Sequence, residues 1–200
     1  MTTSSRTQPS ETRLILVRHG QSESNLLGRF AGQHETPLTD LGRQQARDAA
    51  QRLLGAGIEV AYTSTLGRAR ETAEIICGAL ELQLHPSDAL REMCFGPWQG
   101  EEIAEAQRRW PVDFGHYRHE PHAFALEGAE TFRQVQTRMV DGIHRIAEAH
   151  PGRTVLVVSH GMAIKMLMLH RGGRGLEDLP NVETLPNGHH IEIVVPTSPA

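Results

Sequence analysis

The sequence predicts an α/β fold, built as a three-layer α/β/α sandwich around a mostly parallel central sheet. Short apolar runs alternate along the chain with longer stretches whose apolar residues recur at helical spacing. Two of the runs, 14–17 and 155–158, are apolar throughout, which is typical of strands buried on both faces of a parallel sheet. The length of 200 residues suits one domain around one core.

The alternation also predicts the order of the elements. They are a strand at 14–17, a helix at 40–54, a strand at 58–62, a helix up to residue 80, an edge strand at 82–85, a short helix near 101–110, a long helix at about 131–149, a strand at 154–158, a buried helix at 162–169 and a strand at 191–195.

The first two helices are supported by apolar faces and by residues able to begin or end them. Thr39 or Asp40 can cap the first helix, and Gly55 can end it. The hydroxyl residues 63–65 are expected to cap the second helix, which places Arg68 in its first turn. Positive charge there opposes the helix dipole, so an anion is expected nearby.

The stretch that follows has a different composition. Residues 92–126 hold six of the nine aromatic side chains and three histidines, with no long amphipathic period. We expect residues 92–127 to form an inserted cap that lies over the sheet and sets specificity. His116, His119 and His122 are interpreted as solvated loop residues, as contacts to a phosphorylated substrate or as metal ligands.

The second half of the expected fold rests on three consecutive stretches. The long helix has an apolar face that ends at Pro151-Gly152, a central strand follows, and 162–169 is apolar nearly all round. Residues 13–195 are therefore predicted to form a single domain. Residues 1–12 are predicted to be a disordered tail, and residues 196–200 a second tail.

Composition excludes several classes of protein. A net charge of −4 gives no basic excess for nucleic acid. Cys77 and Cys94 lack CxxC spacing, which argues against a disulfide framework and a zinc site. The first thirteen residues carry no apolar core of a signal peptide, and no apolar run is long enough to span a membrane. We expect a cytoplasmic protein without a metal or other cofactor, and a homo-oligomer remains possible.

Both fully apolar strands end in the dipeptide His-Gly. If the strands are parallel neighbours, His19 and His160 face one pocket at the carboxyl edge of the sheet, where open α/β sheets bind ligands. A neutral imidazole can attack phosphorus once a hydrogen bond fixes its tautomer. Arg18 and Arg68 can grip phosphate oxygens, and a protonated His160 would add a third cation.

Two further side chains complete the chemistry of phosphate-ester cleavage. Asn25 can donate a hydrogen bond to the same oxygens. Glu92 precedes the aromatic cap, surroundings that favour a protonated carboxyl able to act as a general acid for the leaving alcohol. Because phosphoryl transfer depends mainly on positioning and charge stabilisation, this set can act without a metal.

Read together, these residues resemble the histidine phosphatase superfamily, which includes phosphoglycerate mutases. The resemblance runs from Leu14 to about Asn187. The segments that carry it are Arg18-His19-Gly20-x-Ser22-x-x-Asn25, Pro37-Leu38-Thr39-x-x-Gly42-x-x-Gln45-Ala46, Ser64-x-Leu66-x-Arg68-Ala69-x-x-Thr72-Ala73, Leu90-Arg91-Glu92, Phe95-Gly96-x-Trp98-x-Gly100 and Val158-Ser159-His160-Gly161.

The resemblance implies a phosphoglycerate mutase-like fold, no metal, and a role for each matching residue. It makes His19 the phosphoryl acceptor and Glu92 the proton donor. It assigns phosphate binding to Arg18, Asn25, Arg68, His160 and the Gly161 amide. We also expect possible substrate contacts at Ser22, Gln33, Trp98 and Tyr117.

The chain departs from the family pattern at three places. Glu35 stands where Asp is common, Gln99 stands where Glu is common, and 127–130 reads Glu-Gly-Ala-Glu where Gly-Glu-Ser is common. None of them touches the transferring core. We expect each to lie where recognition of the leaving group can change.

The favoured function is a phosphomonoester hydrolase that acts on small phosphorylated metabolites through a phosphohistidine. The alternatives are a phosphoglycerate mutase and a noncatalytic phospholigand-binding protein. Against the mutase, the chain is short and residues 93–95 read Met-Cys-Phe, where mutases look like Arg-His-Tyr. Against the binder, the four residues that a pseudoenzyme would be expected to lose are retained, namely His19, Arg68, Glu92 and His160.

Overall fold

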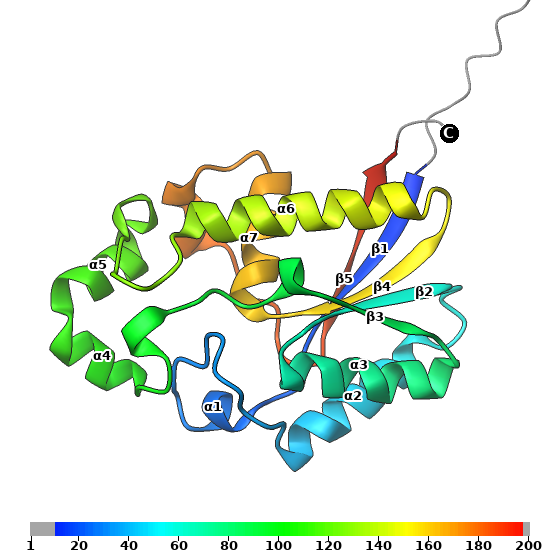
Figure 1. The fold of residues 1–200 in the computed structure, drawn as a ribbon, viewed down its shortest axis with the longest axis horizontal. Helices are drawn as coiled ribbons and strands as arrows, with labels where there is room; N and C mark the ends of the chain where they lie inside the picture. Colours follow the sequence, from blue (N-terminus) through cyan, green and yellow to red (C-terminus); the bar gives the residue numbers. More distant parts are fainter. Residues whose placement is uncertain (1–10, 198–200) are drawn as a thin grey trace, which may run out of the picture.

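A five-stranded sheet forms the centre of the molecule in a computed structural model that describes residues 11–197 (Figure 1). Its strand order is β3-β2-β4-β1-β5. The strands are β1 (Glu11–Arg18), β2 (Val60–Ser64), β3 (Leu84–Ser87), β4 (Thr154–Ser159) and β5 (His190–Pro196). Only β5 runs antiparallel to its neighbour, β1. The prediction of a mostly parallel α/β sheet is therefore confirmed.

Helices cover both faces of this sheet and make the three layers. Helices α2 (Asp40–Leu53) and α3 (Gly67–Leu80) lie on one face, and α6 (Phe132–Ala149) and α7 (Gly161–Arg171) lie on the other (Figure 1). The alternation of side chains along β1 explains the division. Leu14 and Leu16 pack with α6 and α7, whereas Ile15 and Val17 pack with α2 and α3.

The inserted segment folds around its own aromatic cluster. It contains α4 (Ile103–Arg109), α5 (Pro111–His119) and short 3₁₀ turns at Gly96–Trp98 and Pro121–Ala123, and another 3₁₀ turn, Asp88–Leu90, precedes it. Trp98 is fully buried at the centre of the cluster, with Phe30, Tyr117 and Phe124 at ring distances of 5.1, 5.7 and 5.5 Å. Sequence analysis predicted α4 and missed α5, although Pro111 is the residue type favoured in a first helical turn.

The remaining elements complete the loops around the sheet. They are α1 (Glu23–Leu26), which had been expected as loop, and a 3₁₀ turn at Leu176–Asn181. No helix within residues 11–197 is long and apolar enough to cross a membrane.

Several expected boundaries are wrong by a few residues. Strands β2 and β3 each begin and end two residues later than predicted. Strand β1 begins at Glu11 and β5 runs to Pro196, where the two strands pair. The domain is thus longer than 13–195 at both ends, and residues 11, 12 and 196 do not belong to tails. The rest of the expected N-terminal tail, 1–10, and residues 198–200 lie outside the described residues.

The register of β1 and β4 places the two His-Gly turns at one edge of the sheet. Arg18 pairs with Ser159, so the next residue of each strand is the histidine. The turn after β1 then packs directly on the start of α2. A side chain at Gly20 would meet the backbone of Gly42, which explains glycine at that point.

Candidate active site

His19 is held as a neutral ring with one nitrogen directed into the site. Its Nδ1–H donates to the Gly20 carbonyl at 2.6 Å, and its Nε2 accepts a hydrogen bond from Arg68 Nε at 3.3 Å. The side chain is 3% exposed. Burial, together with the charges of Arg68 and Arg18, holds the pKa of His19 well below its usual value. Nε2 therefore carries a lone pair that can attack an electrophile.

His160 lies beside His19, with ring centroids 5.0 Å apart. Its Nε2 is 2.7 Å from the Ser64 hydroxyl, which accepts a hydrogen bond from the Leu66 N–H. If the hydroxyl donates its proton to Nε2, the imidazole carries its own proton on Nδ1. This Nδ1 is buried without a partner among the described residues.

A positive charge on His160 is not supported. The ring is fully buried, and burial together with Arg68 holds the pKa of His160 well below its usual value. His160 is therefore neutral in the free protein and offers a hydrogen bond to a phosphate oxygen rather than a third cation. Ser64 was not among the predicted site residues, although it ends β2 next to the carboxyl end of β4.

Arg68 is fixed so that its guanidinium faces inward. It is 1% exposed and donates to the Gly32 carbonyl at 2.6 Å, the His34 carbonyl at 3.0 Å and the His19 ring. Arg18 donates to the Leu185 carbonyl at 2.8 Å. These contacts place two permanent cations next to the two imidazoles.

A polar atom of Arg18 is left over for a ligand. Its Nε is buried and has no partner among the described residues, as is true of His160 Nδ1. The guanidinium also lies against Gly161, where an added Cβ would be only 3.2 Å from Arg18 Cζ. Buried donors without partners are costly, so their convergence points to an anion that satisfies them when bound.

A carboxylate supports the helix that carries Arg68. The predicted hydroxyl cap of α3 is wrong, because Leu66 is the capping residue and has no side-chain cap bond. Instead Glu35 Oε2 accepts a hydrogen bond from the Gly67 N–H at 2.9 Å, and its charge acts on Arg68. Glu35 thus offsets the conflict between Arg68 and the helix dipole.

Asn25 is positioned by two neighbours. Its Oδ1 accepts hydrogen bonds from the Ser22 backbone and hydroxyl, both at 3.1 Å, and from Asn187 Nδ2 at 3.2 Å. The amide nitrogen of Asn25 is therefore the group left to donate to a ligand. The buried Ser22 hydroxyl donates to Asn25 Oδ1 and accepts the Asn25 N–H, and its contact with substrate stays a prediction. Asn187, which also binds the His19 carbonyl at 2.9 Å, was missed because only the fold brings it near.

Glu92 is docked on the first turn of α7. Its carboxylate oxygens accept hydrogen bonds from the N–H groups of Met162 and Ala163, both at 3.1 Å, and of Met93 at 2.9 Å. The Gly161 N–H, the first of the same helix, has no acceptor among the described residues. The helix N-terminus therefore holds the carboxylate and keeps one donor for phosphate.

Comparison with known proteins agrees with this geometry. Residues 14–197 match the model of the histidine phosphatase superfamily, branch 1. The chain belongs to this superfamily. It is 34% identical to phosphoserine phosphatase 1 of Hydrogenobacter thermophilus over 78% of this chain and 74% of that protein. Membership makes the chain an enzyme of this superfamily and implies phosphate-ester substrates.

Two further similarities are to a mutase and to a solved structure. The chain is 33% identical to a 2,3-bisphosphoglycerate-dependent phosphoglycerate mutase of Bartonella bacilliformis over 83% of this chain and 84% of the mutase. The solved structure of Bacillus stearothermophilus YhfR superposes with a TM-score of 0.88 at 35% identity, covering 90% of both chains. The relatives thus include phosphatases and mutases.

The segment that carries Glu92 in this member of the superfamily is held in place by Arg138 of α6. Arg138 donates to the Ala89, Arg91 and Glu92 carbonyls at 3.1, 2.6 and 2.9 Å. Its Nε also pairs with Glu130 at 2.7 Å, and Glu130 accepts the Cys94 N–H at 2.8 Å. Both ends of the segment around Glu92 are therefore tied to one guanidinium, a role that the sequence pattern gave no means of finding.

Replacing Arg138 with methionine is expected to lower the free energy of unfolding by about 2–4 kcal/mol, because it leaves Glu130 and three carbonyls without their partner. The loosened Glu92 should slow esters with poor leaving groups more than aryl phosphates. Urea denaturation measures the change in the free energy of unfolding. The rates of a series of esters with different leaving groups, taken about 20 °C below the thermal transition, measure the change in leaving-group dependence. Arg133→Met, an exposed change on the same helix, is the control and should alter neither. An Arg138→Met enzyme with unchanged leaving-group dependence would contradict the positioning role.

The other three residues expected to contact substrate, Trp98, Gln33 and Tyr117, lie in different surroundings. Trp98 is fully buried in the aromatic cluster, and its contact with substrate stays a prediction. Gln33 donates to the Glu92 carbonyl at 3.0 Å, and its own N–H donates to Gln99 Oε1 at 2.7 Å. Tyr117 stacks on Phe132 and lines a cavity of about 200 Å³.

The histidines of the inserted segment do not form a metal cluster. Within residues 11–197 no group of three or more His, Cys, Asp or Glu side chains is arranged to hold a metal ion. His116 Nε2 lies 3.6 Å from Glu120 Oε2. His119 lines the same cavity as Tyr117.

The lowered pKa of His19 gives a direct spectroscopic prediction. Burial makes the charged ring costly, so the ring should stay neutral, with its proton on Nδ1, as the pH falls through about 6.5, the ordinary value. Long-range ¹H–¹⁵N correlation spectra, assigned by comparison with His19→Gln, measure the titration midpoint. A midpoint at or above about 6.5 would show that the nucleophile is not held neutral by its surroundings.

Proposed function

We propose that this member of the superfamily is a phosphomonoester hydrolase that acts on small phosphorylated metabolites through a phosphohistidine on His19. The observation that carries the proposal is the pairing of two buried neutral imidazoles with two inward-facing arginines. The lone pair of His19 Nε2 lies within this set of donors, 3.3 Å from Arg68 Nε. A phosphate monoester supplies the electrophile and the negative charge that such a set accommodates.

In the first step Nε2 of His19 attacks phosphorus, and the bond from phosphorus to the ester oxygen breaks. Arg18, Arg68, His160 Nδ1–H and the Gly161 N–H bind the three nonbridging oxygens. The charge on these oxygens is thus stabilised by donors that are already in place. Glu92 gives its proton to the departing alkoxide.

In the second step a water molecule attacks the phosphohistidine. Glu92, now a carboxylate, takes the proton of the water, the bond between phosphorus and Nε2 breaks, and inorganic phosphate leaves. His19 returns to its starting state because its Nδ1–H keeps donating to the Gly20 carbonyl throughout. No metal is needed in either step.

The main alternative is phosphoryl transfer of the phosphoglycerate mutase type, which the identity to the Bartonella protein favours. A mutase must hold a phosphorylated intermediate and return its phosphoryl group to a second hydroxyl. Here the two positions after Glu92 offer no cation for that purpose, since Met93 is fully buried and Cys94 is uncharged. Hydrolysis is therefore the favoured outcome.

One set of assays tests the proposal. Purified protein with chelator and no added metal should release phosphate from aryl and alkyl phosphates, with little exchange between 3- and 2-phosphoglycerate. Glu92→Gln should slow alkyl esters by roughly 10²-fold or more and aryl esters much less, because an activated leaving group needs less protonation. Rapid exchange with little hydrolysis would establish the mutase, and inactivity in both assays together with phosphate binding would indicate a noncatalytic binder.

A further inference from the structure

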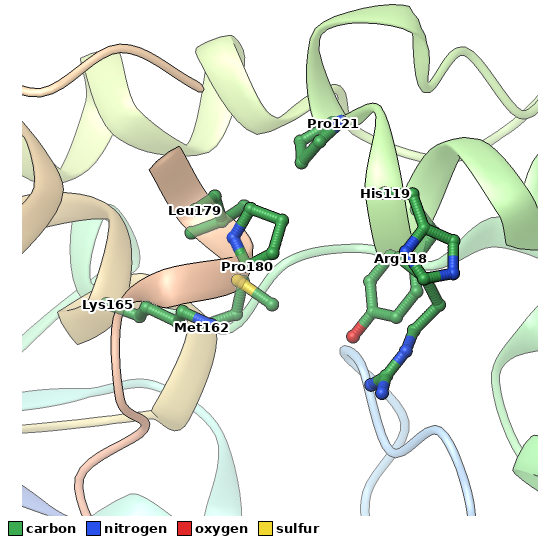
Figure 2. Close-up of a pocket in the computed structure, with 8 residues that line it drawn as sticks. Arg118, His119, Pro121, Met162, Lys165, Leu179 and Pro180 are labelled. Carbon is green, nitrogen blue, oxygen red and sulfur yellow. The ribbon is translucent and has the colours of Figure 1, made fainter. Parts of the chain in front are cut away.

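A small cavity lies between the inserted segment and α7. Its volume is about 200 Å³, smaller than the roughly 300–1,000 Å³ of drug-sized ligand sites. Arg118 and His119 of α5 form one wall, and Met162 and Lys165 of α7 belong to the other (Figure 2). Tyr117 of α5 also lines the cavity. The volume suits a short polar group and is too small for a large leaving group.

The cavity adjoins the side of the active site where the leaving group departs. Met162, in its wall, donates its N–H to Glu92 Oε2 at 3.1 Å. Tyr117, which lines the same cavity, has a pKa raised to about 12 by burial and by the charge of Glu92. The phenol therefore stays protonated and can donate a hydrogen bond. An alcohol that receives its proton from Glu92 would extend into this space.

The walls carry positive charge without a counterion. Lys165, the only lysine of the chain, and Arg118 make no ion pair among the described residues. By contrast, Arg108 and Arg109 of the neighbouring α4 pair with Glu105 and Glu101. Burial, and also the charge of Arg118, lowers the pKa of Lys165, so the two cations act on each other across the cavity. An anion placed between them would relieve both costs.

We propose that this cavity is a subsite for a second anionic group on the leaving alcohol, a carboxylate or a second phosphate, held by Lys165, Arg118 and the Tyr117 hydroxyl. The inference rests on the proposed function, because it places the phosphate of the same substrate between His19 and His160. It narrows the substrates to phosphate esters of short acidic alcohols.

Pairs of substrates that differ in one anionic group test this subsite. O-phosphoserine and O-phosphoethanolamine differ by a carboxylate, and the bis- and monophosphates of 1,3-propanediol differ by a phosphate. The wild-type enzyme is expected to favour the more anionic member of one pair by roughly 10-fold or more in kcat/KM, which is the size of one charge-assisted hydrogen bond. The pair that shows the preference identifies the anion.

Variants then locate the preference. Lys165→Met should lower kcat/KM for the more anionic substrate by roughly 10-fold and for its partner by less than about 2-fold, and Arg118→Met should act in the same direction. Arg47→Met removes an exposed charge on α2, across the sheet, and should leave the ratio unchanged. Equal rates within both wild-type pairs, or equal losses within a pair in both cavity variants, would overturn the subsite.

Binding separates failure of the subsite from failure of the proposed function. Calorimetry of the same substrate pairs with the His19→Ala protein measures recognition without catalysis. Stronger binding of an anionic member, lost in His19→Ala/Lys165→Met, supports the subsite even if the wild-type protein hydrolyses nothing. Equal binding within both pairs overturns it even if the wild-type protein is an active phosphatase.

Discussion

Phosphate release from an aryl phosphate is expected to fall by roughly 10³-fold or more when His19 is replaced by alanine. His19 follows the last residue of β1, and its Nε2 accepts the hydrogen bond from Arg68 Nε. The substitution removes this nitrogen. Water held by the remaining donors would have to attack phosphorus directly. Release of inorganic phosphate, measured with chelator present, gives the rate.

Two controls make this result specific. His144→Ala removes an exposed histidine from α6 and should leave the rate unchanged. His19→Gln keeps much of the buried volume, so equal inactivity of His19→Gln and His19→Ala, with native circular dichroism, separates loss of the nucleophile from loss of the fold. A His19→Ala protein with nearly full activity would remove His19 from the reaction.

Arg68→Met is expected to lower kcat/KM by roughly 10²–10³-fold and to weaken inhibition by vanadate, a phosphate analogue, by a similar factor. The buried Arg68 donates to His19 Nε2 and also to the loop carbonyls of Gly32 and His34. Removing it costs charge stabilisation and leaves those carbonyls unpaired. Arg68→Lys restores the charge without the fork of N–H groups and should recover less than about 10-fold.

The matched control lies two residues away on the same helix. Arg70 is exposed and pairs with Glu74, so Arg70→Met should change kcat/KM and vanadate inhibition by less than about 2-fold. Vanadate inhibition that is equally strong in the wild-type and Arg68→Met proteins would show that this guanidinium does not bind the phosphoryl group.

The central strands of the sheet could be predicted because their burial leaves a local pattern in the sequence. Strands buried on both faces read as apolar runs, and 14–17 and 155–158 show this without interruption. Boundaries were less accurate where the strand is shorter or lies near an edge. Strand β3 has no fully buried residue, so no apolar run marks its limits. The cap of α3 was wrong because its carboxylate, Glu35, comes from a loop 32 residues earlier.

The convergence of His19 and His160 was expected from the rule that parallel strands end at one edge of a sheet. What a side chain does after it is buried could not be read from the sequence. The Ser22 hydroxyl, for example, is bonded to Asn25, and Trp98 lies at the centre of an aromatic cluster. Likewise, the sequence left open whether His160 is protonated, because the burial and the nearby Arg68 that lower its pKa depend on the complete fold.

The three departures from the family pattern all support backbone. Glu35 accepts the Gly67 N–H, Gln99 accepts the Gln33 N–H, and Glu130 accepts the Cys94 N–H. They had been expected where recognition of the leaving group changes. In the structure they instead hold the loops that position Arg68 and Glu92, while the unpaired cations that face the leaving group are Lys165 and Arg118.

The most direct test is to look for the phosphoryl group on His19 itself. The wild-type enzyme, quenched in alkali within milliseconds of mixing with excess substrate, should carry one acid-labile phosphoryl group on the tryptic peptide that contains His19. Fragmentation by mass spectrometry should place it on that ring. A phosphoryl group found on another residue, or turnover in which no phosphoenzyme forms at any quench time, would contradict nucleophilic attack by His19.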